Sequence, residues 1–291
     1  MNDRIPPLHV GQGTTLGALT IFPIWIESEP IRGLEWRPSV LRVSERVGSP
    51  VVGELVAQNA SPQPLVALEG DLVTGGWQDR MLAASVILAP GEARMLDALC
   101  VEHGRWSGAQ AHSATGRRAA LGVRHQNLAA RRRPDRNAQH DVWGRIARYD
   151  TALGGSETAT LSAHLDRTSP DVRRLPRPIA GQRGLIVGVG GRILGAELFG
   201  SPRGLALRWQ GSLEAAVLDA RLAPERSTQA EAARGFARVM AGMRLEVGVE
   251  SPESRAIAST RGSVRATGLA RESMVYLSLL DESHPVLEVA A

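Results

Sequence analysis

The sequence predicts an α+β fold in which a β-rich antiparallel N-terminal half packs with a mixed helix and hairpin C-terminal half. Up to about residue 125, apolar and alternating runs are broken by turn residues, as in strands. From Val142 onward, apolar residues recur at helical spacing. Hydrophobic residues make up 43 % of the 291 residues and charged residues 22 %, which is the composition of an ordinary globular protein.

The first half reads as short strands. Three expected strands come first: residues 16–26, 51–57 and 65–68. Residues 81–88 and 95–101 then flank Pro90-Gly91-Glu92, a sequence suited to a tight connection. We therefore expect these two runs to pair as a β-hairpin. Asn59 and Asn127 stand at expected strand ends.

The second half begins with a helix whose apolar face is Val142, Ile146, Tyr149 and Leu153, and Gly154 follows it in the manner of a C-cap. We expect Ser156 to cap a second short helix that ends at about Arg167.

Further along, residues 184–199 alternate around Gly190-Gly191 and predict a hairpin. A helix should follow, with this apolar face: Leu205, Trp209, Leu213, Val217 and Ala220. Thr228 with Glu231 has the spacing of a capping box for a helix that ends near Met240. Two strands, near 263–267 and 274–280, are expected to close the chain.

The polar connector between the two halves is rich in arginine. We therefore expect a β-rich lobe at about 8–128, an arginine-rich linker at about 129–137 and an α/β lobe at about 138–285. The linker holds the densest basic cluster: Arg131, Arg132, Arg133 and Arg136. The net charge of +4 is modest for a surface that tracks phosphates, so the cluster is interpreted as solvated and nucleic acid is not an expected partner. RNA or DNA binding through the cluster is the weakest of three functional hypotheses.

The absence of lysine excludes several classes of enzyme. All 34 basic residues are arginine. A Walker phosphate loop, a pyridoxal phosphate enzyme and a protein kinase each need a lysine, so these three classes are excluded.

The sequence is that expected of a soluble cytoplasmic protein. Its single cysteine, Cys100, cannot form an intramolecular disulfide, which fits a reducing compartment. Its apolar runs are shorter than the roughly 18 residues of a membrane span, and an acid and two prolines stand where a signal peptide needs basic and then apolar residues. We expect no membrane partner.

The segment 68–80 combines glycines, carboxylates, Gln78 and Arg80. On a strand, Glu69 and Asp71 would project from one face, because the side-chain period is two. Paired carboxylates can bind a divalent cation or share acid and base roles. The alternative is a bulged turn whose carboxylates pair with arginine.

The segment 100–106 is the second candidate. Strand geometry separates Cys100 from His103, so a catalytic cysteine is disfavoured. Arg105 could bind a phosphate or carboxylate, and Trp106 could stack on a base. The alternative for Trp106 is a plug at one end of the sheet.

Both segments carry a family resemblance. The runs Glu69-Gly70-Asp71, Gly75-Gly76-Trp77-Gln78-Asp79-Arg80 and Cys100-Val101-Glu102-His103-Gly104-Arg105-Trp106 resemble the ARPP family, named for association with ADP-ribosylglycohydrolase and rhodanese-phosphatase proteins. Residues 139–143 and 184–220 look similar to later parts of that family. The resemblance implies one integrated domain over residues 1–291 and a setting in ADP-ribose or nucleotide metabolism, without implying a particular reaction.

The leading functional hypothesis is a pocket for a small phosphorylated ligand of the nucleotide or ADP-ribose type, with hydrolysis left open. Its catalytic or cation-binding residues would be Glu69, Asp71 and Glu102. Its ligand-binding residues would be Gln78, Arg80, Arg105 and Trp106. The rival hypothesis is a non-catalytic interaction or regulatory module, with a protein partner, in which the same residues form a structural polar network.

Overall fold

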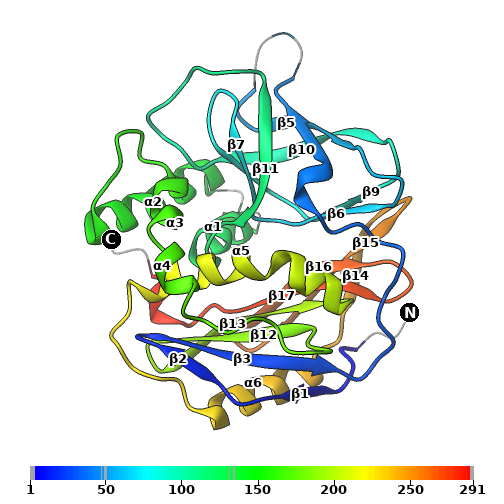
Figure 1. Cartoon of the computed structure of the whole chain (residues 1–291), viewed down its shortest axis with the longest axis vertical. Helices are drawn as coiled ribbons and strands as arrows, with labels where there is room; N and C mark the ends of the chain where they lie inside the picture. The colour runs from blue at the N-terminus through cyan, green and yellow to red at the C-terminus, as the bar shows by residue number, and fades with distance from the viewer. Residues whose placement is uncertain (1–3, 47, 49–50, 131, 134, 289–291) are drawn as a thin grey trace. The chain divides into compact units, whose positions relative to one another are not determined.

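The computed structural model describes residues 4–46, 48, 51–130, 132–133 and 135–288, and it confirms the α+β class (Figure 1). The chain divides into two compact units. Unit 1 contains the residues up to Arg32 together with Asp171–Trp209 and Asp219–Glu288, and unit 2 contains Gly33–Pro170 and Gln210–Leu218. These units do not follow the expected lobes, because the first strands group with the C-terminal part. That the chain is one integrated domain stays a prediction.

Unit 1 is built on a nine-stranded antiparallel sheet. Its order is β1-β3-β12-β13-β17-β16-β15-β14, and β2 also pairs with β3. The strands are β1 (Leu8–Val10), β2 (Thr14–Leu16), β3 (Leu19–Ile26), β12 (Gly184–Val189), β13 (Arg192–Phe199), β14 (Glu246–Ser251), β15 (Ser254–Arg261), β16 (Val264–Ala270) and β17 (Met274–Asp281). The expected hairpin at 184–199 is confirmed as β12 and β13.

Helix α6 (Ala230–Ala241) buries one apolar face in the core of unit 1. Its inward side chains are those of Ala233, Phe236, Ala237 and Met240. They belong to the same core as Phe22 of β3 and Ile186 of β12, whose Cα atoms are register partners. A strand from the N-terminus and a strand from the middle of the chain thus share one core.

Unit 2 contains a closed six-stranded barrel with the order β10-β5-β4-β11-β7-β8. Its strands are β4 (Leu41–Ser44), β5 (Glu54–Asn59), β7 (Asp71–Gly75), β8 (Arg80–Leu82), β10 (Ala93–Cys100) and β11 (Ala111–Arg118). β6 (Leu65–Ala67) and β9 (Val86–Leu88) form a separate pair. Leu55, Val73, Leu82 and Ala98 are among the buried side chains of the cluster that fills this part.

The remaining elements are helical. They are η1 (Pro38–Val40), α1 (Leu121–Ala130), α2 (Ala138–Leu153), α3 (Leu161–Asp166), α4 (Ser169–Val172), α5 (Pro202–Ala220) and η2 (Pro285–Leu287). The predicted α2 is confirmed, with Asn137 as N-cap and Gly154 as C-cap, and the predicted α5 is confirmed as well.

The hairpin expected across Pro90-Gly91-Glu92 is wrong. The turn is present, since the Glu92 amide donates to Ala89 O at 3.1 Å, but β9 pairs with β6 while β10 pairs with β5 and β8. The side-chain amide of Asn59 donates to the carbonyls of Leu88 and Ala89 at 3.0 Å each, so the carbonyls at the end of β9 bond to a side chain of β5.

Two expected helix caps are also wrong. The side chain of buried Thr228 donates to Arg192 O at 3.4 Å, so α6 begins after Gln229 without a side-chain cap. Ser156 accepts from the Thr160 amide and closes a turn, and Thr160 itself caps α3. Local spacing fits both motifs, but a distant carbonyl takes the hydroxyl group of Thr228, and the hydroxyl group of Ser156 closes the turn before α3.

Candidate functional site

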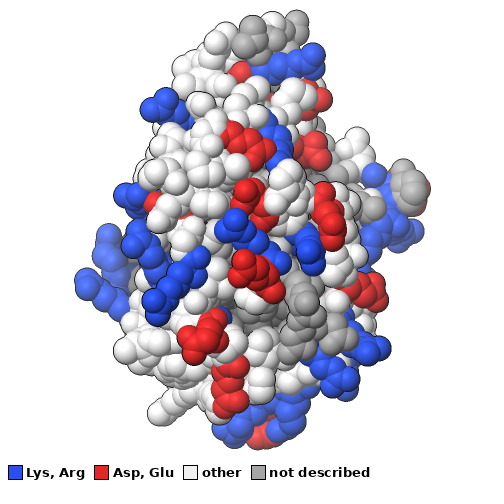
Figure 2. Space-filling view, turned by 90° about the vertical axis from the view of Figure 1, so that its right-hand side faces the viewer, with Lys and Arg blue, Asp and Glu red and all other residues white. Residues whose placement is uncertain are grey.

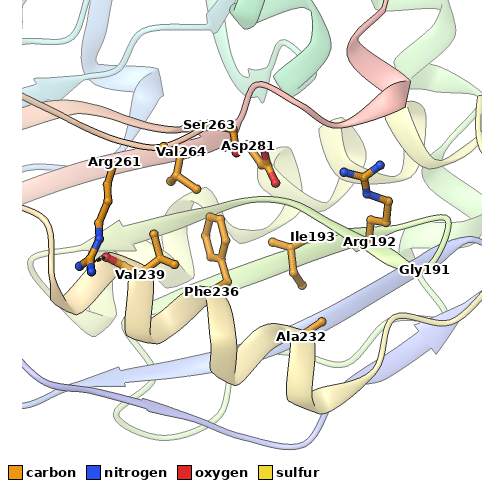
Figure 3. A pocket seen from close by; sticks show the side chains of 11 residues that line it. Gly191, Arg192, Ile193, Ala232, Phe236, Val239, Arg261, Ser263, Val264 and Asp281 are labelled. Atoms are coloured by element: carbon orange, nitrogen blue, oxygen red, sulfur yellow. Dashed lines mark hydrogen bonds between the residues drawn. The ribbon is translucent and has the colours of Figure 1, made fainter.

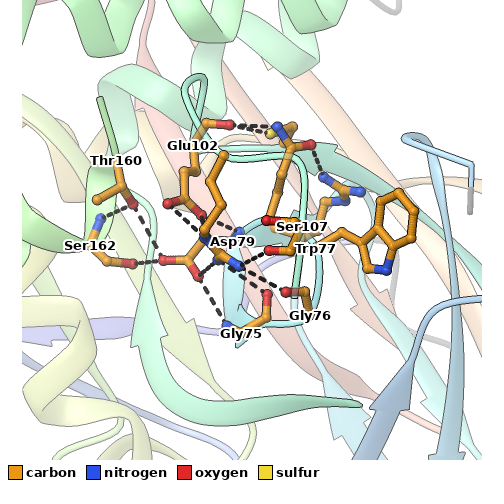
Figure 4. Close-up of polar contacts among 12 residues, drawn as sticks. Gly75, Gly76, Trp77, Asp79, Glu102, Ser107, Thr160 and Ser162 are labelled. Carbon is orange, nitrogen blue, oxygen red and sulfur yellow. Dashed lines mark hydrogen bonds and ion pairs between the residues drawn. The ribbon is translucent and has the colours of Figure 1, made fainter. Parts of the chain in front are cut away.

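Two segments singled out in the sequence meet at one end of the barrel, beside β8 and β10 (Figure 4). The Asp79 amide donates to Glu102 Oε2 at 2.9 Å, and the Gln78 amide nitrogen donates to the Glu102 carbonyl at 3.0 Å. All three residues are buried. The turn before β8 and the end of β10 therefore form one polar cluster.

Arg105 holds the centre of this cluster with every N–H donor group engaged. Its Nε lies 3.0 Å from both Glu102 carboxylate oxygens, and Nη2 donates to Glu102 Oε2 at 2.6 Å. Nη2 also lies 3.4 Å from Asp79 Oδ1 and from Gly75 O. Nη1 donates to the carbonyls of Gly76 at 2.8 Å and Ser107 at 3.1 Å. Each nitrogen of the guanidinium thus has a protein acceptor.

Asp79 is the functional-looking residue that the sequence analysis passed over. Its Oδ1 accepts from the Gly75 amide at 3.0 Å, and its Oδ2 accepts from Ser162 Oγ at 2.5 Å and Thr160 Oγ1 at 3.3 Å. The two hydroxyl groups come from the N-cap and the first turn of α3, roughly 80 residues away in the chain. No local pattern joins them to Asp79.

The backbone fixes the same connection. The Leu161 amide donates to Val101 O at 2.9 Å, and the Gly104 amide donates to Thr158 O at 2.9 Å. Ala159 lies between these points with φ of 46°, the one positive φ among the described non-glycine residues. The cluster therefore links the barrel to the start of α3.

Glu69 and Asp71 form separate ion pairs. Glu69 Oε2 accepts from Arg124 Nε of α1 at 2.9 Å. Asp71 Oδ1 lies 3.3 Å from Arg118 Nε, and Arg118 also donates to Glu69 O at 2.9 Å. This matches the bulged-turn alternative, in which the carboxylates pair with arginine. Their partners are thus Arg118 and Arg124 rather than Arg105.

Arg80 belongs to a second buried group. Its Nη1 donates to Gln78 Oε1 at 2.6 Å, and its Nη2 lies 3.8 Å from Glu45 Oε1. His112 Nε2 is 3.1 Å from the same Glu45 oxygen. Burial lowers the pKa of His112, which outweighs the opposing effect of Glu45. Arg80 is 1 % exposed and offers no surface to a ligand.

Trp106 and Trp77 lie outside the hydrogen-bonded cluster. Trp106 is 52 % exposed, so it does not plug the sheet. Trp77 contributes its backbone amide to Glu45, while its indole points away from the cluster in Figure 4.

The ionisation of the cluster is fixed by its own contacts. Burial alone would raise the pKa of Glu102, but hydrogen bonds from Arg105 and the Asp79 amide lower it. The hydrogen bond to Glu102 raises the pKa of Arg105. Burial raises the pKa of the Cys100 thiol. A charged ion pair beside a protonated thiol offers neither a free base nor a thiolate nucleophile near neutral pH.

Candidate metal ligands do not cluster in the part of the chain that the structure describes. Among the described residues, no group of three or more His, Cys, Asp or Glu side chains is placed to hold a metal ion. No helix among them is long and apolar enough to cross a membrane.

A pocket of about 560 Å³ lies elsewhere, in unit 1 (Figure 3). Ile193, Phe236, Val239 and Val264 give it an apolar lining. Arg261 also lines it, and its guanidinium donates to the carbonyl of Val239 at 3.4 Å, near the end of α6. None of the seven predicted site residues lines this pocket.

The arginine-rich connector is partly neutralised. Arg133 lies 3.6 Å from Asp135, and Arg136 lies 2.8 Å from Asp141. Arg131 lies outside the described residues. On the face drawn in Figure 2, acidic and basic side chains are interspersed over much of the surface.

The fold and the cluster define an α+β protein that combines a closed barrel and a nine-stranded sheet with a saturated arginine network. The chain belongs to the ARPP-1 family, described as the ARG and Rhodanese-Phosphatase-superfamily-associated Protein domain, whose model matches residues 7–280. No curated protein and no solved structure matched the chain.

A separate ion pair in unit 2 gives a pH prediction. Hydrogen bonds from Arg37 and from the Trp36 and Arg37 amides lower the pKa of Glu35 from 4.5 to about 2, against the effect of burial. Because the pKa of Glu35 is lower in the folded state, its ionised carboxylate stabilises the fold at pH values above the unfolded-state pKa of 4.5. This stabilisation is lost as the pH falls toward 2. Because Arg37 is half exposed, solvent weakens the ion pair, and we expect it to contribute about 2 kcal/mol to the free energy of unfolding at neutral pH.

The measurement is urea unfolding of the parent and Glu35→Gln at pH 7 and pH 3. The variant should be less stable at pH 7, and the difference should shrink at pH 3. An equal difference at both pH values would contradict the assigned ion pair.

Proposed function

We propose that this chain acts as a non-catalytic interaction module in which the Arg105 network is structural. One observation carries the proposal: the guanidinium of Arg105 already has protein acceptors for all its donors. A phosphate could bind there only after one or more of these contacts broke. Glu102 and Asp79 would then be left buried without their cation, which is costly.

The carboxylates argue in the same direction. Glu102 is already ionised and engaged with Arg105 and the Asp79 amide. Glu69 and Asp71 are committed to two other arginines. Acid–base catalysis needs a group that can exchange a proton with a substrate, and these groups are buried in ion pairs. The geometry therefore favours a structural role for these carboxylates over a catalytic one.

A small phosphorylated ligand is the second proposal, and the exposure of Trp106 favours it. This indole is available to stack on a base beside the cluster. The family description, through its ARG association, gives ADP-ribose as the first compound to test. Under either proposal we expect the protein to work in the cytoplasm.

A thermal-shift screen separates the two proposals. The parent protein would be tested with ADP-ribose, NAD, nucleotides and sugar phosphates, with and without magnesium or manganese. A ligand at about a hundredfold its Kd would stabilise the fold by roughly 2.7 kcal/mol, which is readily measured. For an interaction module we expect no saturable shift.

Two variants test whether an observed thermal shift comes from a ligand bound at Trp106. Trp106→Ala removes the exposed indole without touching the Arg105 contacts, and Met95→Ala removes a side chain that is 50 % exposed elsewhere on the barrel. A saturable shift that is lost in Trp106→Ala and kept in Met95→Ala would overturn the interaction module and establish the ligand site.

A further inference from the structure

The loop of residues 173–183, which connects α4 to β12 in unit 1, is held at defined points. The indole of Trp209 donates to Pro176 O at 3.0 Å, and the indole of Trp25 donates to Ala180 O at 3.0 Å. Between them the Ile179 amide donates to Gln182 Oε1 at 2.9 Å. Leu175 is buried and anchors the first part of the loop. The backbone conformation is therefore set before any partner arrives.

Three exposed arginines project from this fixed backbone: Arg173, Arg174 and Arg177. Within the described part of the chain, none of their guanidinium groups has an acidic partner or a hydrogen bond. The acid nearest in sequence, Asp171, accepts instead from Arg221 at 2.7 Å. Among the residues that the structure describes, these three cations thus stand within five positions without an ion-pair partner.

Arg105, Arg234 and Arg238 have protein partners that the loop arginines lack. Arg105 is saturated with acceptors, and Arg234 and Arg238 pair with Glu231. A guanidinium is a planar donor that binds carboxylates in a bidentate manner. Because the backbone is already fixed, binding through this loop would order fewer degrees of freedom. Ile179, which is 52 % exposed, adds an apolar contact beside the charges.

We propose that the loop of residues 173–180 docks an acidic protein segment, one that carries several carboxylates around an apolar side chain. The inference rests on the proposed interaction function and supplies its partner class. A nucleic acid fits less well, because three cations and a net charge of +4 give little counterion release along a phosphate backbone. A protein segment can match both the arginines and Ile179.

The test is a binding titration by fluorescence anisotropy at low salt. The probe is a labelled twelve-residue peptide of alternating Glu and Asp around a central leucine, and its Gln and Asn counterpart is the neutral control. The loop variant is Arg173→Gln/Arg174→Gln/Arg177→Gln. The matched variant is Arg234→Gln/Arg238→Gln/Arg255→Gln, which removes the same charge from exposed arginines already paired with Glu231 or Glu250.

We expect the parent to bind the acidic peptide and to show no measurable binding of the neutral peptide. The loop variant should lose about tenfold in affinity, because each exposed pair with the peptide contributes little but three arginines act together. The matched variant should lose less than about twofold, because its arginines lie outside the proposed docking loop. Equal losses in the two variants, or no binding to the parent, would overturn the docking surface. Tighter binding of a twelve-nucleotide single strand than of the peptide would overturn the choice of a protein segment.

The two proposals can fail separately. If the peptide does not bind and the phosphorylated compounds give no thermal shift, only the docking surface is wrong. If a phosphorylated compound gives a saturable shift that depends on Trp106, the interaction module itself is wrong, whatever the peptide does.

Discussion

Arg105→Ala is expected to lower the free energy of unfolding by about 3 kcal/mol, because it leaves buried carboxylates without their cation. Glu102 and Asp79 are 4 % and 7 % exposed, so water cannot fully replace the lost donors. The carbonyls of Gly76 and Ser107 lose a partner as well. Urea unfolding at pH 7 measures the effect.

Matched variants separate this network from an ordinary surface pair. Arg94 pairs with Glu92, whose side chain is 25 % exposed compared with 5 % for Glu102, so Arg94→Ala should cost less than about 1 kcal/mol. Adding Glu102→Gln to Arg105→Ala should recover part of the loss, because one uncompensated charge disappears. A loss in Arg105→Ala no larger than that in Arg94→Ala would show that the network is not structural.

Gly268→Ala is expected to destabilise unit 1 by about 3 kcal/mol or more, through overpacking of the sheet. Gly268 lies in β16, between β15 and β17, and its Cα is the register partner of Leu277. A Cβ at this position would lie 2.0 Å from Tyr276 O and 2.9 Å from Leu277 Cα. Both atoms belong to the backbone, so no side-chain movement can relieve the clash.

Gly248→Ala provides the control for this prediction. Gly248 lies in the edge strand β14, and a Cβ there would meet Ala256 Cβ at 3.7 Å, an ordinary contact. Its cost should stay within about 0.5 kcal/mol, as for most surface substitutions. Both variants would be compared by thermal and urea unfolding. Similar melting temperatures for the two would contradict the tight strand pairing at Gly268.

Elements with complete local signals could be predicted from the sequence. Helix α2 has helical periodicity, an N-terminal asparagine and a C-terminal glycine within one stretch of chain. The β12–β13 hairpin turns at Gly190 and Gly191, whose φ values of 58° and 89° favour glycine. Each signal depends on neighbours in sequence, so the pattern and the structure agree.

The closure of the barrel and the β14–β15 hairpin at the edge of the nine-stranded sheet were not predicted. Strand β10 pairs with β5 and β8, and nothing in its own sequence selects those partners over the adjacent β9. Strand β14 is exposed along nearly its whole length, so the alternation of apolar and polar residues that identifies a half-buried strand is absent. Helix α1 follows β11 within the region expected to be all strand, and Asn127 lies within it rather than at a strand end.

The candidate cluster was predictable only in part. Gln78, Glu102 and Arg105 do lie together, as the pocket hypothesis required. Alternation along β7 and β8 could not show that Glu69 and Asp71 would meet arginines of α1 and β11. The hydroxyl groups of Thr160 and Ser162 reach Asp79 through tertiary folding alone.

The pairing of β3 with β12 sets an order for folding during synthesis on the ribosome. All six barrel strands of unit 2 have been made once Arg118 emerges, whereas β3 must wait for residues 184–189. Local contacts form early and distant ones late, so the barrel should be the first part to become protease-resistant in a growing chain. Until β12 has been made, the apolar sequence of β3, from Leu19 to Ile26, lacks this neighbouring strand and is expected to bind chaperones.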